Sequence, residues 1–231
     1  MTRDGTALRP ARRDDLRGLP LDVAPRLLGA ELATDVDGER IRLRITEVEA
    51  YHGRGTGDLP DPGSHARMGP TARNATMWGE PGHLYVYLSH GIHSCVNVVC
   101  GPEGTAGGVL LRAGEVVEGM DAAARRRGVG SPLSRTALRD LARGPGRLGQ
   151  AVGLRYALHD GIDAVDGAEQ NGAVARLMLG RMLDDVSAGP RVGVAGVAGT
   201  MAFPWRFWIT GDPTVSPFRW GRGAAEAART P

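Results

Sequence analysis

Residues 39–51 constrain the fold more than any other stretch, because their regular pattern carries acids toward a buried face. Over residues 40–45, arginine alternates with isoleucine or leucine, a period of two that predicts a half-buried β-strand. Continued along the chain, the same parity sends Glu47 and Glu49 to the apolar side. A buried carboxylate is costly unless it is hydrogen-bonded or paired with a charge. The strand therefore either has a bulge at Val48, which returns this valine to the core, or helps to build a functional site.

The composition favours one domain rich in strands and loops. A chain of 231 residues with 42% hydrophobic content can bury a sizeable core, and its 35 glycines and 15 prolines indicate many turns. None of the 28 basic residues is lysine, so an enzyme of this sequence cannot form a Schiff base on a lysine side chain. The net charge of +2 is too small for a protein that coats nucleic acid, so a polyanion must be met by a local patch.

Cysteine usage and the chain start argue against a metal site and against export. Cys95 and Cys100 have no further Cys or His at metal-binding spacing, which predicts two reduced thiols and no metal. The first residues contain no apolar run of the kind found in signal peptides, and no stretch suits a membrane span. We therefore expect a cytoplasmic protein that needs no cofactor and has no membrane partner.

Two hairpins are expected in the first half of the chain. Residues 30–36 and 40–48 form strands that are joined at Asp37-Gly38, a dipeptide typical of tight hairpin turns. Residues 83–89 and 92–100 form a second pair with His90-Gly91 near the tip. Between the two hairpins lies a Gly/Pro-rich loop over 52–82, and loops of this length are usually functional or disordered.

Several polar residues near the second hairpin have two explanations each. Tyr85 and Tyr87 share one strand face, which reflects β-propensity alone or a stacking platform for a planar ligand. Asn97 lies among valines on the return strand, where its amide must bond to the backbone or to a ligand. Arg112 ends an apolar strand over 107–113 and requires a carboxylate or a phosphate.

The second half of the chain offers fewer signals. Residues 118–128 are predicted to be helical. Gly144–Leu148 read as a loop that leads into a helix, whose first N–H groups suit a phosphate. Residues 191–197 and 205–210 are predicted to be closing strands.

Short segments that are weak alone form a specific set when taken in order. They are Arg44–Tyr51, Pro81–Tyr87, Cys95–Asn97, Val109–Ala113, Gly144–Leu148 and Arg191–Val194, with His65 ahead of Ala72-Arg73-Asn74. Together they resemble the alkyladenine (3-methyladenine) DNA glycosylase family over about residues 20–217. The resemblance implies an α+β fold, in which a single mixed domain has a curved antiparallel sheet, surrounding helices and a protruding β-hairpin that inserts into DNA. We expect residues 1–19 to form a flexible N-terminal arm, residues 20–217 the glycosylase domain, and residues 218–231 a flexible C-terminal tail.

The resemblance also implies roles for individual residues. Glu49 matches the general base that activates water for attack on the sugar C1′, and Arg112 and the backbone carbonyl of Val192 match groups that hold this water. The residues that match the pocket around the flipped base are Tyr51, His65 and Tyr87 as its walls and Asn97 as the group that obstructs the amine of guanine. Glu47 matches no assignable role.

The contacts to the DNA helix are the part of the site where the chain departs from the family. His90 stands where the family commonly has a tyrosine wedge, so histidine fills the gap itself or shares the task with Ile92 and His93. We expect the DNA phosphates to be held by Arg67, Arg73 and the helix start at Gly146 and Arg147.

The expected activity is that of a monofunctional, monomeric DNA glycosylase in base excision repair, associated with a bacterial nucleoid. It would flip damaged purines out of double-stranded DNA and leave an abasic site, with 3-methyladenine and 7-methylguanine as substrates and hypoxanthine and ethenoadenine as further candidates. One alternative is a hydrolase of free nucleosides or sugars that uses Glu47 and Glu49 as paired acids. Others are a non-catalytic lesion-binding protein and, ranked last, a helix-hairpin-helix glycosylase suggested by residues 144–148.

Overall fold

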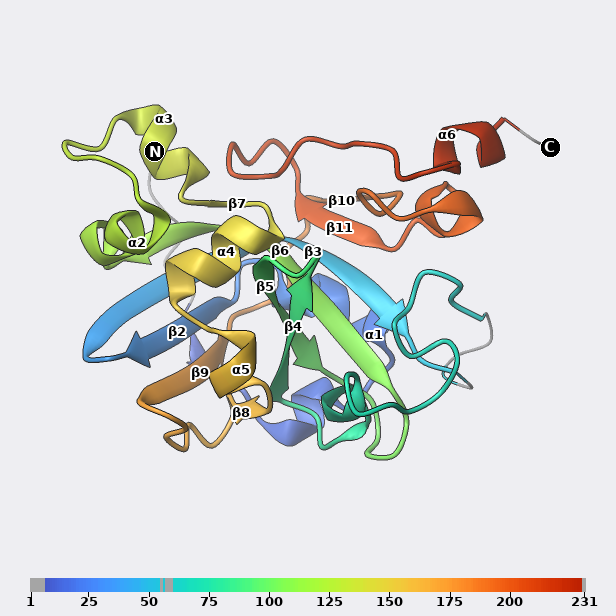
Figure 1. Ribbon diagram of the computed structural model, residues 1–231, viewed down its shortest axis with the longest axis horizontal. Coiled ribbons are helices and arrows are strands. Elements are labelled where there is room, and N and C mark those ends of the chain that lie inside the picture. The colour runs from blue at the N-terminus through green and yellow to red at the C-terminus, as the bar shows by residue number, and fades with distance from the viewer. Residues whose placement is uncertain (1–6, 55, 57–59, 230–231) are drawn as a thin grey trace.

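A single antiparallel sheet of eleven strands organises the structure (Figure 1). The computed structural model describes residues 7–54, 56 and 60–229. The main path of the sheet runs β1-β9-β2-β3-β6-β5-β4-β8, while β11 joins β3 and β10, and β7 joins β6. The strands are β1 (Arg9–Pro10), β2 (Glu31–Val36), β3 (Glu39–His52), β4 (His83–Ser89), β5 (His93–Val99), β6 (Gly107–Glu118), β7 (Ala142–Arg143), β8 (Ile162–Asp163), β9 (Ala173–Leu179), β10 (Val186–Gly189) and β11 (Arg206–Ile209).

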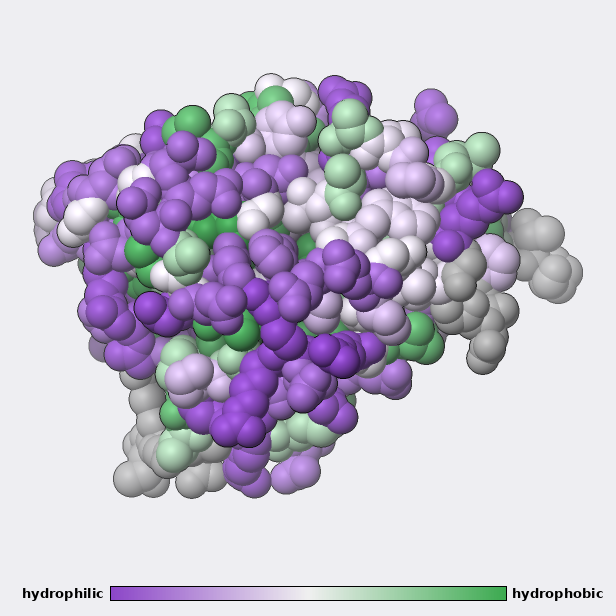
Figure 2. All heavy atoms as spheres, turned by 90° about the horizontal axis from the view of Figure 1, so that it is seen from below, coloured by the Kyte–Doolittle hydropathy of each residue, from purple (hydrophilic) through white to green (hydrophobic). Residues whose placement is uncertain are grey.

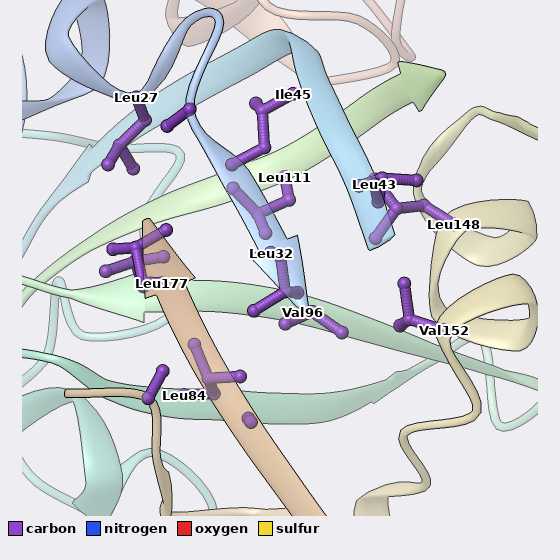
Figure 3. Packing of buried hydrophobic residues seen from close by; sticks show 14 of the residues in the cluster. Leu27, Leu32, Leu43, Ile45, Leu84, Val96, Leu111, Leu148, Val152 and Leu177 are labelled. Carbon is purple, nitrogen blue, oxygen red and sulfur yellow. The ribbon is translucent and has the colours of Figure 1, made fainter. Parts of the chain in front are cut away.

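Short helices surround this curved sheet, which confirms the predicted α+β class. They are α1 (Pro20–Val23), α2 (Met120–Arg127), α3 (Arg135–Asp140), α4 (Pro145–Val152), α5 (Tyr156–His159) and α6 (Ala224–Ala227), with 3-10 turns η1 (Arg13–Leu16), η2 (Ala24–Leu27), η3 (Ala75–Trp78) and η4 (Gly196–Gly199). Helix α4 packs on the sheet through Leu148 and Val152, close to Leu43 (Figure 3). A Cβ on Gly149 would collide with the carbonyl of Ser94, so glycine here lets α4 approach β5 closely.

Both predicted hairpins are present. Asp37 and Gly38 take the left-handed conformation, with φ of 54° and 78°, and join β2 to β3 as expected. Strand β3 extends four residues beyond the predicted end at Val48, because β6 and β11 pair with its second half.

A pair of bulges in the middle of β3 and β6 decides which side chains face the core. Ile45 lies opposite Gly114 and Glu47 opposite Ala113, so Thr46 is an extra residue on β3. Val48 then lies opposite Leu111, which makes Arg112 an extra residue on β6. Because a one-residue slip reverses the alternation, Val48 returns to the core, while Glu47 and Glu49 lie on the other face. The predicted bulge is therefore present, and it precedes Val48.

The closing segment differs from its prediction. Residues 191–197 do not form a strand, and the prediction of one was wrong. Gly193 and Gly196 have φ of 72° and 59°, which turns the chain into η4. The strand expected over 205–210 is confirmed as β11.

The described parts of both expected flexible ends pack onto the body of the protein. Arg9–Pro10 pair with β9, and Leu16 is fully buried. At the other end, the carbonyls of Arg219 and Arg222 accept hydrogen bonds from Gly193 and Gly196. Residues 1–6 and 230–231 lie outside the described residues.

Charged side chains are kept mainly at the surface. The face shown in Figure 2 is covered largely by hydrophilic residues, with hydrophobic ones scattered among them. Across the described ranges, the helices are all too short or too polar to traverse a lipid bilayer.

Candidate active site

A cleft of about 1160 Å³ brings the predicted site residues together. Its walls come from the β4–β5 hairpin, the start of α4, the 52–82 loop and residues 192–195. All twelve residues selected from the sequence line it: Glu49, Tyr51, His65, Arg67, Tyr87, Arg73, His90, Asn97, Arg112, Gly146, Arg147 and Val192. Residues that are up to 143 positions apart in the sequence, such as Glu49 and Val192, therefore share one cavity.

Glu49 lines the cleft and is held by three protein donors. The backbone N–H of Val192 donates to its Oε1 at 2.7 Å, and the hydroxyl of Tyr51 donates to Oε2 at 2.8 Å. The guanidinium of Arg112 approaches Oε1 at 3.3 Å. These contacts fix the carboxylate, whose side chain is only 1% exposed, in a single orientation.

Glu47 lies two residues away on the same strand face and accepts from four protein donors. Its Oε1 accepts from Nε of Arg112 at 3.0 Å, from Nε of Arg206 at 2.7 Å and from Oγ of Ser216 at 2.9 Å. The backbone N–H of Ser216 donates to Oε2 at 2.7 Å. Glu47 is therefore a buried anchor that orients Arg112 toward Glu49, a role that the sequence left unassigned.

The buried charges keep Arg112 cationic. Burial by itself favours the neutral guanidine, but the carboxylates of Glu49 and Glu47 outweigh it and raise the pKa of Arg112 above its ordinary value. Burial, reinforced by the charge of Glu49, raises the pKa of Tyr51 well above its usual range. The phenol therefore stays protonated and can act as a hydrogen-bond donor to the carboxylate.

Aromatic rings line the same cleft as Glu49. All four tyrosines of the chain, at positions 51, 85, 87 and 156, line the cleft. The rings of Tyr85 and Tyr87 stack at 5.5 Å with an interplanar angle of 22°, and His65 meets Tyr87 edge-on at 4.6 Å. Burial, aided by the charge of Arg67, lowers the pKa of His65, so its imidazole is neutral near pH 7.

Asn97 is tied to the backbone at the base of this wall. Its side-chain nitrogen donates to the carbonyl of Tyr85 at 3.0 Å, and the residue is buried within the cleft lining. Of the two explanations offered by the sequence, the structure shows the backbone contact.

The tip of the β4–β5 hairpin exposes apolar and imidazole side chains at the mouth of the cleft. His90 and Gly91 have positive φ of 50° and 71°, so the chain turns sharply between Ser89 and His93. Ile92 is 72% exposed, and His90 is exposed beside it. A Cβ on Gly146 would collide with the ring of His93, so glycine there lets the start of α4 lie against the hairpin.

Arginines border the cleft on two sides. Arg127, Arg143 and Arg147 line the side formed by α2, β7 and α4. Arg67 and Arg73 line the opposite side, where the side chain of Asn74 organises the loop by bonding Thr71 and the carbonyls of His65 and Gly69. The basic patch required by the small net charge is therefore present at the cleft. Among the described residues, no three His, Cys, Asp or Glu side chains gather closely enough to hold a metal ion.

Comparison with known proteins agrees with this geometry. A family model described as methylpurine-DNA glycosylase (MPG) matches residues 15–213. The chain belongs to this family. It is 48% identical to a protein of Leifsonia xyli subsp. xyli over 219 residues, 95% of this chain and 97% of the relative, and 49% identical to one of Nocardia farcinica over 212 residues, 90% and 92% of the two chains. A relative from Streptomyces avermitilis is 47% identical over 212 residues, 91% and 92% of the two chains. All three are provisionally named 3-methyladenine DNA glycosylase.

Membership confirms the resemblance seen in the sequence and makes this methylpurine-DNA glycosylase family member one of the DNA glycosylases of base excision repair.

The sequence analysis missed one buried ion pair next to the cleft. Arg191 and Asp61 form two hydrogen bonds, of 2.8 and 2.7 Å, and both side chains are fully buried. Asp61 also accepts from the N–H of His52, which ties the start of the long loop to β3. The Arg191 guanidinium lies over the ring of Tyr51 at 4.5 Å.

Proposed function

We propose that this DNA glycosylase excises alkylated purines, with 3-methyladenine and 7-methylguanine as its main substrates, from duplex DNA. Water activated by Glu49 attacks C1′ of the sugar and leaves an intact abasic site. The observation that carries the proposal is the fixed carboxylate of Glu49 in an aromatic cleft bordered by arginines.

The aromatic walls suit a flipped, positively charged base. A purine alkylated at N3 or N7 carries positive charge, and extruding it from the helix costs a few kcal/mol, less when its pairing is damaged. Stacking such a ring against Tyr51 and Tyr87 supplies a cation–π contribution of about 0.5–2 kcal/mol. The neutral state of His65 avoids repelling the cationic base, which protonated imidazole would do.

The surroundings of Glu49 suit a general base. A carboxylate has roughly four lone-pair sites, and the described donors Val192, Tyr51 and Arg112 occupy three of them. One site remains for a water molecule, which the Val192 carbonyl would help to orient. The negative charge also stabilises the oxocarbenium-like sugar that forms as the base departs.

A monofunctional reaction follows from the nucleophile. Because the chain has no lysine, no lysine side chain can attack C1′ and open the route to strand cleavage. We therefore expect no borohydride-trapped adduct with DNA. A monomer suffices for this chemistry, because one chain supplies every group invoked.

The surroundings of Glu47 argue against the alternative of a hydrolase that uses Glu47 and Glu49 as paired acids. A hydrolase of free nucleosides needs a second carboxyl that can reach the bond being broken, whereas Glu47 is fully buried and bonded to Arg112, Arg206 and Ser216.

The hairpin tip would fill the space left by the flipped nucleotide. Because histidine stacks less well than tyrosine, we expect His90 to share this task with Ile92. Ile92→Ala and His90→Ala should each weaken binding to a lesion-containing duplex severalfold, and the double variant should weaken it more. An Ile92→Ala variant that binds as tightly as the wild type would assign the wedge to His90 alone.

The decisive experiment measures base release from a panel of duplexes, each with one modified purine, under single-turnover conditions. Wild type should release 3-methyladenine and 7-methylguanine, and tests of hypoxanthine and ethenoadenine would show whether neutral bases are also accepted. Glu49→Gln should bind the duplexes but release bases about 10²–10⁴-fold more slowly. Glu103→Gln, a change of an exposed acid, is the matched control. Retained activity in Glu49→Gln would refute the mechanism.

A further inference from the structure

The C-terminal strap, which we define as residues 214–222, is hydrogen-bonded to two residues that line the cleft. It follows β11 and leads to α6 (Figure 1, red). The carbonyl of Val215 accepts a hydrogen bond from Nε of Arg143 at 2.9 Å, on the α4 side of the cleft. The carbonyl of Arg219 accepts from the N–H of Gly193, which also lines the cleft, at 2.9 Å. The strap is therefore continuous with the lining of the cleft.

The inner side of the strap is held firmly. Ser216 bonds Glu47 through both its N–H and its hydroxyl, and its carbonyl accepts from Nη2 of Arg206 at 2.8 Å. A Cβ on Gly221 would collide with the carbonyl of Val194, so the strap packs backbone against backbone on the 193–196 turn. Its outer side chains are thus presented from a fixed backbone.

The outer side presents aromatic and cationic groups that the fold does not use. Phe218 and Trp220 are 36% and 47% exposed, and their rings meet edge-on at 4.8 Å. Arg219 and Arg222 are exposed, and neither has an ion-pair partner among the described residues. Two free cations beside an exposed aromatic pair form a surface that complements a polyanion with apolar sugars.

We propose that the outer side of the strap binds the DNA duplex next to the flipped nucleotide. Arg219 and Arg222 contact backbone phosphates, and the Phe218–Trp220 pair packs against deoxyribose. The inference rests on the proposed function, because it extends the same DNA footprint beyond the cleft. The family match ends at residue 213, so the strap lies outside the segment that defines the family.

The test uses the full-length double variant Arg219→Ala/Arg222→Ala. Both backbone carbonyls remain, so the hydrogen bonds that hold the cleft wall are kept. Binding to a duplex with a tetrahydrofuran abasic analogue is measured against salt concentration. The slope of log K against log salt should become shallower by about 1.8, which corresponds to two phosphate contacts. The matched control, Arg17→Ala/Arg26→Ala, changes two exposed arginines remote from the cleft and should keep the wild-type slope.

Two further measurements separate the aromatic and positional parts of the inference. Trp220→Ala should weaken binding about threefold with an unchanged salt slope, because it removes an apolar contact and no charge. A third measurement compares the wild type and the double arginine variant on duplexes shortened from one end or from the other. The binding defect of the variant should disappear only when the shortening removes the flank that the strap contacts.

The possible outcomes are distinct. An unchanged slope in the double variant, with wild-type binding and base release intact, would overturn the strap inference alone. Loss of self-association in this variant, seen by light scattering with DNA binding preserved, would assign the surface to a second copy of the chain and also overturn it. A wild type that neither binds nor releases modified bases would overturn the proposed function and this inference together.

Discussion

Glu47 and Glu49 have the same chemistry, lie on the same face of β3 and are two residues apart, yet their surroundings differ. Glu47 has four protein donors and no access to the cleft, whereas Glu49 has three donors and lines the cleft. Arg112 bridges the two. The comparison teaches that the number of donors and access to the cleft, rather than residue type or strand position, distinguish the two carboxylates.

The largest expected effect is on catalysis at Glu49. Glu49→Gln should reduce base release by about 10²–10⁴-fold, while its thermal unfolding changes much less than that of a Glu47 variant. Single-turnover release and a thermal melt on the same preparation measure both. A Glu49→Gln protein that melts far below the wild type and regains activity at low temperature would show that both acids are structural.

The converse expectation applies to Glu47. Glu47→Gln leaves Arg112 and Arg206 buried beside a neutral group, and loss of one partner in such a network destabilises a protein by about 3–5 kcal/mol. Urea denaturation measures this against Glu103→Gln. Should Glu47→Gln unfold like the wild type but lose base release, the two acids would have exchanged the roles assigned to them.

A smaller effect is expected at Ser216, which connects the strap to Glu47 and Arg112. Ser216→Ala removes the hydroxyl that donates to Glu47 and lies 3.3 Å from Nη2 of Arg112. A hydrogen bond to a charged group contributes about 1.5–3 kcal/mol, so the unfolding free energy should fall by this amount and base release severalfold, with DNA affinity retained. Ser187→Ala, which removes an exposed hydroxyl bonded to Thr210, is the control.

The smallest expected effect is on the pH dependence of DNA binding. It concerns His65, which lines the cleft together with Glu49. Because burial lowers the pKa of His65, the imidazole stays neutral from pH 8 to below its ordinary value of about 6.5. Binding of a duplex with a cationic purine should be constant over that range and weaken severalfold only at lower pH. His65→Gln should remove this decline, and a matched duplex with a neutral purine should not show it. A decline that begins above pH 7 would contradict the lowered pKa.

The sequence was sufficient for strands β2 to β6 and β11 and for the residues that line the cleft, because both are recorded in local patterns, but it did not predict β8, β9 or β10. Alternation located β3, β4 and β5, and the family motifs selected Glu49, Tyr51 and Asn97. The sequence was insufficient for segments that have no regular alternation of apolar and polar residues. Asp61 lies in an irregular loop, and Ser216 follows the last strand, so nothing local indicates that they bond Arg191 and Glu47. The strand expected over 191–197 failed because valines alternate with glycines whose positive φ turns the chain.

The extra residue at Thr46 divides β3 into two halves that follow opposite rules. Before it, the apolar set faces the interior; after it, the same counting would place the acids there. Removing Thr46 would place Glu47 directly after Ile45, so plain alternation would keep Val48 in the core and Glu49 on the cleft face without a bulge. Thr46 is thus the residue that the bulge absorbs, and a regular ladder that kept it in register would turn Glu47 and Glu49 into the core and Val48 out of it.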